Sequence, residues 1–272
     1  MARKSGGRSR QQTAQPTLRD LPTGPVQTSL AQAELVARDS GLLLLLDGTE
    51  SSFIDLRDPT YLDFEYQQQM NAVLDVFYPV GMPVRAVHLG GAGCALARAW
   101  DALRPRSSQL AVEIDEILAN SVRAWFELPR SPALRIRVGD AAAVAPTLRP
   151  DSWDVAVRDV FVSGTVPESV RGEKFAQACA QALTPTGLYL ANAASQPREV
   201  AAAELSAVRS AFTSVLVVAD PAVVRGRRRG NLLFVASKQE WTPAQYDAVE
   251  RAVRKLPLPA RSWRGNDREL PT

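Results

Sequence analysis

The residues best able to carry chemistry follow apolar segments that are predicted to be β-strands. The first such segment, Val84–Leu89, leads into a turn that contains Gly90, Gly91 and Gly93. Glycine lets a backbone approach a ligand closely, and the amides at the start of the helix that follows are free to bind one. A lone glycine-rich turn is weak support for a site, because turn glycines also occur without a ligand.

Acidic residues follow the next two predicted strands. Glu113 ends the second strand about 20 residues after the glycine turn, where a carboxylate can accept hydrogen bonds from both ribose hydroxyls. Asp115 is the alternative acid, unless it caps the next helix. Asp140 and Ala141 follow the third strand, where an acid can meet an adenine amino group. Open α/β sheets bind ligands at this edge, so the pattern predicts a site for an S-adenosyl-type nucleotide.

A further carboxylate, Asp159, ends the segment Trp153–Asp159 and is expected at the same edge. It could accept a proton or hold a cationic substrate nitrogen, or it could simply be a solvated residue at a strand end.

The only histidine, His88, lies inside a predicted strand, which favours a structural role. Cys94 and Cys179 lie at helical positions, so neither a disulfide framework nor a metal site is expected.

The elements that must position these residues alternate from residue 84 onward. The predicted strands are Val84–Leu89, Gln109–Ile114, Leu134–Val138, Trp153–Asp159 and Gly187–Ala191, and the helices between them are 94–104, 115–127, 141–148 and 172–183. A helix at 197–212 precedes two more strands, Ser214–Ala219 and Asn231–Ser237, which the arginine-rich segment 225–230 joins. This order predicts an α/β fold with a seven-stranded, Rossmann-type sheet ending in an antiparallel hairpin, the class I methyltransferase-like layout.

The N-terminal part has a different pattern. Residues 1–30 are basic and show no apolar period, so they are predicted to be a disordered tail. Within residues 31–60, three short apolar segments separated by Ser-Gly and Asp-Gly turns predict a small antiparallel sheet. Apolar residues at helical spacing between 62 and 77 then predict a helix. Residues 61–256 are expected to form the nucleotide-binding domain and 257–272 a C-terminal extension.

Composition limits the classes of partner. Hydrophobic residues make up 46% and charged residues 22% of the 272, as in globular proteins with a core. The net charge is +3, but residues 1–30 carry about +4, so the remainder is near −1 and nucleic-acid binding is disfavoured. No apolar run approaches the ~18 residues of a membrane span, and no secretory signal is recognisable. A cytoplasmic protein without a membrane partner is expected.

Together these segments resemble the spermidine synthase family of polyamine aminopropyltransferases over about residues 33–240. The N-terminal Leu46-Asp47-Gly48 is similar to a strand end of that family, and the segments around Glu113 and Asp140 match well. The predicted linker helix carries the family's Phe-x-Tyr motif as Phe64-Glu65-Tyr66. The resemblance implies that Asp159 and Tyr66 are catalytic residues and that Gln67 and Gln68 bind substrate.

The chain departs from the family at several carboxylates. Gly93 stands where the family has the aspartate that holds the aminopropyl amine, and Val162 replaces the second acid of the Asp-x-x-Asp-Pro motif. Gln68 replaces the glutamate of the linker helix. Each lost charged hydrogen bond removes about 1.5–3 kcal/mol of interaction with an amine.

The resemblance implies a divergent, actinobacterial-type enzyme that moves an aminopropyl group from decarboxylated S-adenosylmethionine to a polyamine amine. Two alternatives stay open: a methyltransferase that uses intact S-adenosylmethionine, and a catalytically silent nucleotide-binding homologue. The expected partners are a small-molecule amine and an S-adenosyl co-substrate, decarboxylated or intact, with no metal. A homodimer is left open.

Overall fold

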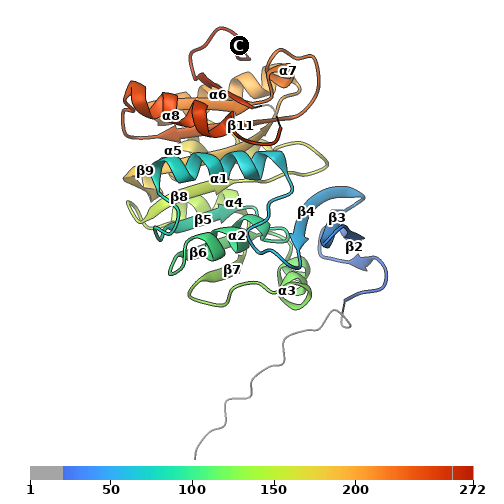
Figure 1. The fold of residues 1–272 in the computed structure, drawn as a ribbon. Coiled ribbons are helices and arrows are strands. Elements are labelled where there is room, and N and C mark those ends of the chain that lie inside the picture. Colours follow the sequence, from blue (N-terminus) through green and yellow to red (C-terminus); the bar gives the residue numbers. More distant parts are fainter. Residues whose placement is uncertain (1–20, 259, 272) are drawn as a thin grey trace, which may run out of the picture.

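The structure, a computed structural model, describes residues 21–258 and 260–271. A small N-terminal sheet lies beside a larger mixed sheet that carries helices on both faces (Figure 1). No helix among the described residues is both long and apolar enough to cross a membrane.

The N-terminal sheet has four antiparallel strands: β1 (Val26–Gln27), β2 (Gln32–Arg38), β3 (Gly41–Leu46) and β4 (Thr49–Asp55). Positive φ angles at Asp39 and Gly48 allow the two tight turns that the sequence predicted. The buried face of the sheet, which includes Leu44 and Ile54, packs on Leu118 of helix α3 (Glu116–Trp125). The prediction of disorder is wrong for residues 26–30: Val26 and Gln27 form β1, and Thr28, Ser29 and Leu30 donate hydrogen bonds to Asp115, which caps α3. Residues 1–20 lie outside the described residues.

The large sheet has eight strands in the order β12-β10-β11-β9-β8-β5-β6-β7. Five are parallel: β5 (Arg85–Leu89), β6 (Ser108–Glu113), β7 (Leu134–Val138), β8 (Trp153–Arg158) and β9 (Leu183–Ala194). The antiparallel hairpin is β10 (Ser214–Ala219) with β11 (Asn231–Ser237). The expected count of seven was one too low, because β12 (Arg261–Arg264) of the predicted C-terminal extension joins the edge through β10.

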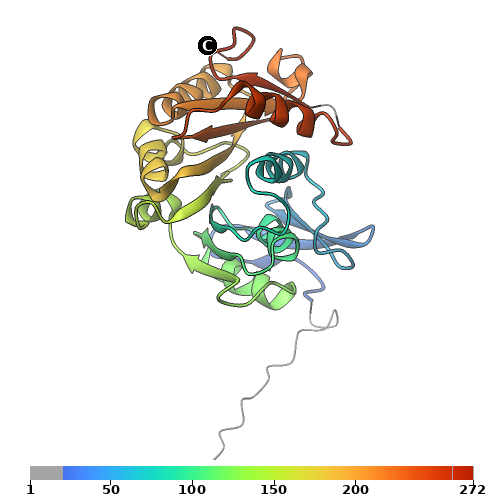
Figure 2. The ribbon, with the colours of Figure 1, turned by 60° about the vertical axis from the view of Figure 1, so that its left-hand side comes forward.

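Helices cover the two faces of the large sheet (Figures 1 and 2). On one face are α1 (Glu65–Phe77), α2 (Ala95–Leu103), α3 (Glu116–Trp125) and α8 (Pro243–Val253), the last of which the sequence analysis did not include. On the other are α4 (Ala141–Val144), η2 (Ala145–Thr147), α5 (Glu173–Ala182) and α6 (Arg198–Ala211); η3 (Glu168–Val170) precedes α5 and α7 (Pro221–Val224) follows β10. Successive strand residues face opposite clusters, as Ala86 and Val87 do, so both cores depend on the same strands.

Candidate active site

The turn after β5 brings two parts of the sheet edge into contact. Gly90 has a φ of +96°, and a Cβ atom there would lie 2.1 Å from the carbonyl oxygen of Asp159. Only glycine combines this backbone conformation with this close approach. The glycine turn and the end of β8 are therefore fixed next to each other, as the parallel-sheet prediction required.

Glu113, at the end of β6, faces the glycine turn. Its Oε2 accepts hydrogen bonds from the amides of Gly91 (3.2 Å) and Ala92 (2.8 Å), and its Oε1 accepts from the amide of Asp115 (3.0 Å). The side chain is only partly buried. A carboxylate has about four lone-pair positions, so Glu113 keeps acceptor capacity for hydroxyl groups.

Asp115, the alternative acid, is committed to another task. It is buried and caps α3 by accepting from the amide of Leu118 at 2.8 Å. It also accepts from Thr28 Oγ1 (2.5 Å) and from the amides of Ser29 (3.0 Å) and Leu30 (2.8 Å). With its oxygens engaged by four donors, Asp115 has little capacity for a ribose, and Glu113 remains the candidate.

The other residues predicted to bind the nucleotide are divided between the edge and the interior. Asp140 is exposed beside this edge and caps α4 by accepting from the amide of Ala142 at 2.8 Å, while Ala141 is the buried first residue of that helix. Gly93 is also buried, and its amide donates to Ser52 Oγ of β4 at 2.9 Å. A Cβ at position 93 would lie 2.7 Å from Ser52 Cβ. The structure therefore brings Gly91 against Glu113 and places Asp140 next to Gly139, whose amide donates to the backbone oxygen of Glu113. It turns Gly93 toward the N-terminal sheet.

The two predicted catalytic residues are in direct contact. Tyr66 Oη on α1 donates to Asp159 Oδ2 at 2.7 Å, although the residues are 93 positions apart. Asn192 Nδ2 on β9 donates to the second oxygen, Oδ1, at 2.9 Å. Burial raises the pKa of the Asp159 carboxyl, against the effect of these hydrogen bonds and of the nearby Arg158 charge. Burial and the Asp159 carboxylate also raise the pKa of Tyr66, which stays a hydrogen-bond donor.

The neighbouring residues of α1 have separate contacts. Gln67 is buried, and its Nε2 lies 3.4 Å from Tyr66 Oη, so it is part of the same cluster. Gln68 Nε2 instead donates to the carbonyl oxygen of Leu62 at 2.8 Å and holds the segment that leads into the helix. Glu65 lies 3.9 Å from Arg228 of the arginine-rich segment.

Three polar residues behind Asp159 were not singled out from the sequence: Arg158, Asn192 and Glu204. Arg158 is completely buried, forms an ion pair with Glu204 of α6, and donates to the backbone oxygen of Asn192. The available signal was a charged or amide residue within an otherwise apolar strand, since such a residue needs a buried partner. The sequence could not identify that partner.

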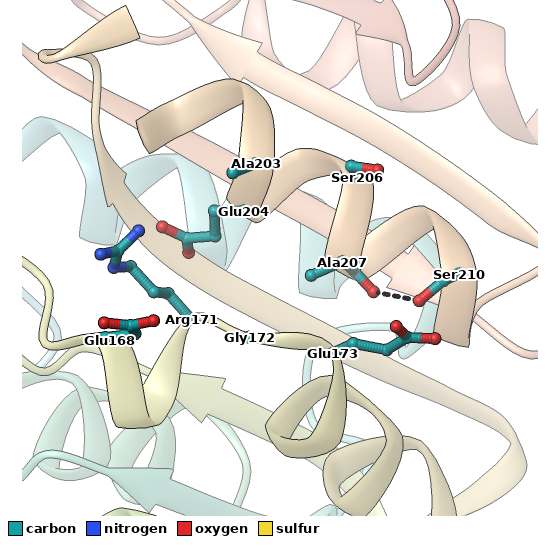
Figure 3. Close-up of a pocket in the computed structure, with 9 residues that line it drawn as sticks. All are labelled: Glu168, Arg171, Gly172, Glu173, Ala203, Glu204, Ser206, Ala207 and Ser210. Carbon is teal, nitrogen blue, oxygen red and sulfur yellow. Dashed lines mark hydrogen bonds between the residues drawn. The ribbon is translucent and has the colours of Figure 1, made fainter. Parts of the chain in front are cut away.

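Glu204 also lines a pocket of about 340 Å³ between η3, the start of α5 and α6 (Figure 3). Glu168 and Arg171 line the pocket on the side opposite Glu204. This pocket lies on the α5 and α6 face of the sheet and contains none of the residues predicted to bind ligands.

The histidine and the two cysteines lie in the interior of the protein. His88 is buried, its Nε2 lies 2.9 Å from Gln109 Oε1, and burial lowers its pKa to about 4. Cys94 and Cys179 are buried and free. No group of three or more His, Cys, Asp or Glu side chains within 21–258 and 260–271 is arranged to hold a metal ion.

No protein-family model matches the chain. The crystal structure of a probable spermidine synthase from Corynebacterium glutamicum is 33% identical, with a TM-score of 0.83, over 90% of this chain and 91% of that one. This chain belongs to the spermidine synthase family.

Two further proteins are similar to this spermidine synthase family member, one in sequence and one in structure. The polyamine aminopropyltransferase of Chromobacterium violaceum is 24% identical over 237 residues, which are 85% of this chain and 86% of that protein. Human methyltransferase-like protein 13, solved in complex with SAH, has a TM-score of 0.57 at 21% identity, over 71% of this chain and 94% of that one. The class I methyltransferase-like fold is confirmed. The spermidine synthase and aminopropyltransferase homologues support a spermidine synthase-like transferase over a methyltransferase or a silent homologue.

Proposed function

We propose that this protein transfers the aminopropyl group of decarboxylated S-adenosylmethionine to a primary amine of a polyamine and releases methylthioadenosine. The observation that carries the proposal is the contact between Tyr66, Asp159 and Asn192 directly beside the Gly90 turn. Membership of the spermidine synthase family supports it. The names of two relatives, a probable spermidine synthase and a polyamine aminopropyltransferase, indicate the same reaction.

The reaction requires a neutral amine and a well-placed acceptor for its proton. The nitrogen lone pair attacks the carbon bound to the sulfonium, the C–N bond forms, and the C–S bond breaks with its electron pair left on sulfur. The new ammonium then loses a proton to Asp159 or to solvent. Because burial raises the pKa of Asp159, its carboxylate is a stronger base than an exposed one. Orientation of the two reactants supplies most of the remaining acceleration.

The donor would bind along the ends of β5, β6 and β7. Glu113 would accept hydrogen bonds from the ribose hydroxyls, and Asp140 with Ala141 would lie at the adenine. Gly90 and Gly91 allow the backbone to pass close to the sulfonium end of the donor. Gly93 offers no carboxylate to the donor amine, so weak discrimination between decarboxylated and intact S-adenosylmethionine is expected.

The acceptor would lie near Tyr66 and Asp159, which can orient its reacting nitrogen. Gln67 is proposed to bind the acceptor because its side chain contacts Tyr66. Gln68 is proposed to act on the acceptor site through the segment that its amide holds. Neither glutamine carries a charge, so recognition of a second ammonium group of the acceptor would be weak at this point.

Calorimetric titration and product analysis test the proposal together. The protein is titrated with decarboxylated S-adenosylmethionine, intact S-adenosylmethionine and methylthioadenosine, and methylthioadenosine release is followed with and without putrescine or spermidine. We expect binding of all three and release that depends on the amine. A thousandfold preference for the intact donor with formation of S-adenosylhomocysteine would show a methyltransferase. Binding of methylthioadenosine without turnover of either donor would show a catalytically silent nucleotide-binding homologue.

A further inference from the structure

A connected set of buried polar residues lies directly behind Asp159. Asn192 is 2% exposed and donates to Asp159 Oδ1 at 2.9 Å. The guanidinium of Arg158, which is fully buried, donates to the backbone oxygen of the same Asn192. Its other side forms an ion pair with Glu204, which is 3% exposed. The contacts thus run from α6 through β8 to β9 and end on the carboxylate of Asp159.

Stability alone is a poor explanation for this arrangement. Removing an arginine and a carboxylate from water has a desolvation penalty of several kcal/mol per ion, and well-packed apolar residues often stabilise such a position as well or better. Asn192 Oδ1 is, in addition, buried without a hydrogen-bond partner among the described residues. The side-chain amide of Asn192 therefore donates a hydrogen bond to Asp159 through Nδ2, while its Oδ1 accepts none from the described residues.

We propose that Asn192 and the Arg158–Glu204 pair are positioning residues that hold the Asp159 carboxylate in place and keep it ionised inside the protein. The inference rests on the proposed role of Asp159 in aminopropyl transfer. Arg158 holds the strand at Asn192, Asn192 holds one carboxylate oxygen, and Tyr66 holds the other. Glu204 balances the charge of Arg158, so the guanidinium can be buried next to the site.

Each charged or polar group that faces Asp159 shifts the pKa of its carboxyl in a known direction. Tyr66 from α1 and Asn192 from β9 donate to the ionised form, and the positive charge of Arg158 on β8 favours it, while burial opposes it. Loss of Asn192 or of the ion pair is therefore expected to raise the pKa of Asp159. A lower ionised fraction at a given pH moves the acidic limb of the pH profile to higher pH.

The chain contains a matched control pair. Arg104 is also fully buried, forms an ion pair with Asp75, and donates to the backbone oxygen of Pro79. Among the described residues, the hydrogen bonds and the ion pair of the Arg104 side chain do not involve Tyr66, Asp159 or Asn192. Removing this pair reproduces the loss of a buried arginine and its carboxylate without changing the proposed positioning contacts.

The experiment compares Asn192→Ala, the double variant Arg158→Met with Glu204→Leu, and the control Arg104→Met with Asp75→Leu. The Asp159 carboxyl is titrated by 13C NMR in the full chain, with Asp159→Asn used for assignment, and kcat and KM are measured against pH. We expect both test variants to raise the pKa by about one unit and lower kcat about tenfold, as for loss of one hydrogen bond to a charge. The KM of the donor should stay within about twofold.

Failure of the inference can be told apart from failure of the proposed function. Test variants that titrate and turn over like the control variant would overturn the positioning role. If the double variant does not fold, Asn192→Ala alone decides. If the wild type shows no aminopropyl transfer but Asn192→Ala still raises the pKa of Asp159, the proposed function is wrong and the positioning of the carboxylate stands.

Discussion

The two halves of the sheet edge are built differently. In the nucleotide half (Gly90, Gly91, Glu113 and Asp140), the two acids accept hydrogen bonds from backbone amides of adjoining turns. In the amine half (Tyr66, Asp159 and Asn192), the acid accepts from two side chains that are 93 and 33 residues away. The first half is held by backbone amides that lie within 22 residues along the chain, and the second by side chains that the packing of α1, β8 and β9 brings together.

The difference matches the tasks proposed for them. Binding a ribose needs an acceptor that backbone amides hold in a defined position, and the glycine turn supplies those amides. Accepting a proton needs a basic carboxylate, and burial raises the pKa of Asp159. A folded-state pKa above the unfolded value means that the ionised Asp159 lowers stability at neutral pH and that this loss shrinks as pH falls through the raised value. Burial of Asp159 is therefore expected to lower the free energy of unfolding at neutral pH while it makes the carboxylate a stronger base.

The largest expected effect would separate catalysis from binding. Asp159→Asn should reduce amine-dependent methylthioadenosine release about 10³-fold, or about 4 kcal/mol, because it removes the proton acceptor. Donor affinity by calorimetry should change less than about twofold, and the free energy of unfolding should not fall at pH 7. Asp154→Asn, at the start of the same strand and paired with exposed Arg85, is the control. Equal loss in both variants would contradict a special role for Asp159.

A substitution in the nucleotide half should weaken binding of every adenosyl ligand without changing which donor is preferred. Glu113→Ala should weaken binding of methylthioadenosine by about 1.5–3 kcal/mol, the range for hydrogen bonds to a charged group. The loss should be equal for decarboxylated and intact S-adenosylmethionine, because both carry the same ribose. Calorimetry measures it, with Glu116→Ala on the first turn of α3 as the control. Unchanged affinity would mean that another acid binds the ribose.

Deletion of the N-terminal segment tests whether the turn at Asp115, next to Glu113, depends on residues distant in the sequence. The sequence predicted that residues 1–30 are a disordered tail, but Thr28, Ser29 and Leu30 donate to the buried Asp115. Deletion of 1–30 should therefore lower the free energy of unfolding by about 2 kcal/mol by chemical denaturation, whereas deletion of 1–20 should not. Equal stability of the two deletions would contradict this.

The same deletion has a defined pH dependence. The pKa of Asp115 is lowered: burial raises it, but the hydrogen bonds from Thr28, Leu118, Ser29 and Leu30 outweigh that effect. A lowered folded-state pKa gives stability that is complete above the ordinary value of 3.8 and is lost as pH falls through the lowered one. The difference in the free energy of unfolding between the deletion of 1–30 and the deletion of 1–20 should therefore shrink as pH falls through that range.

The smallest expected effect concerns the choice of donor. Without a carboxylate for the donor amine, the two donors should differ by less than about tenfold, or about 1.4 kcal/mol, in affinity. Gly93→Asp alone, the change that the sequence suggests, would push its Cβ against Ser52. Gly93→Asp combined with Ser52→Gly makes room and should favour the decarboxylated donor, with Ser52→Gly alone as the control. A thousandfold preference in the wild type would reveal an amine-binding group elsewhere.

Much of the fold was predictable because its signals are local. The strand ending in Val138 was predicted with its observed bounds, and the strand near 187–191 was found but is longer, Leu183–Ala194. β12 was missed, since Trp263 is the only buried residue of a four-residue segment that is otherwise polar. Such a short strand exists only because β10 offers an unpaired edge.

The sequence by itself determined the glycine turn, Glu113, Asp140 and Asp159 as residues at strand ends, because hydrophobic periodicity locates the strands and the parallel order brings their ends to one edge. Only the tertiary structure decided that Asp115 holds the N-terminal segment, that Gly93 faces Ser52, and that Asn192 and Arg158 lie behind Asp159. Partners of a buried polar group come from distant strands and helices. Their identity depends on packing, which no local pattern records.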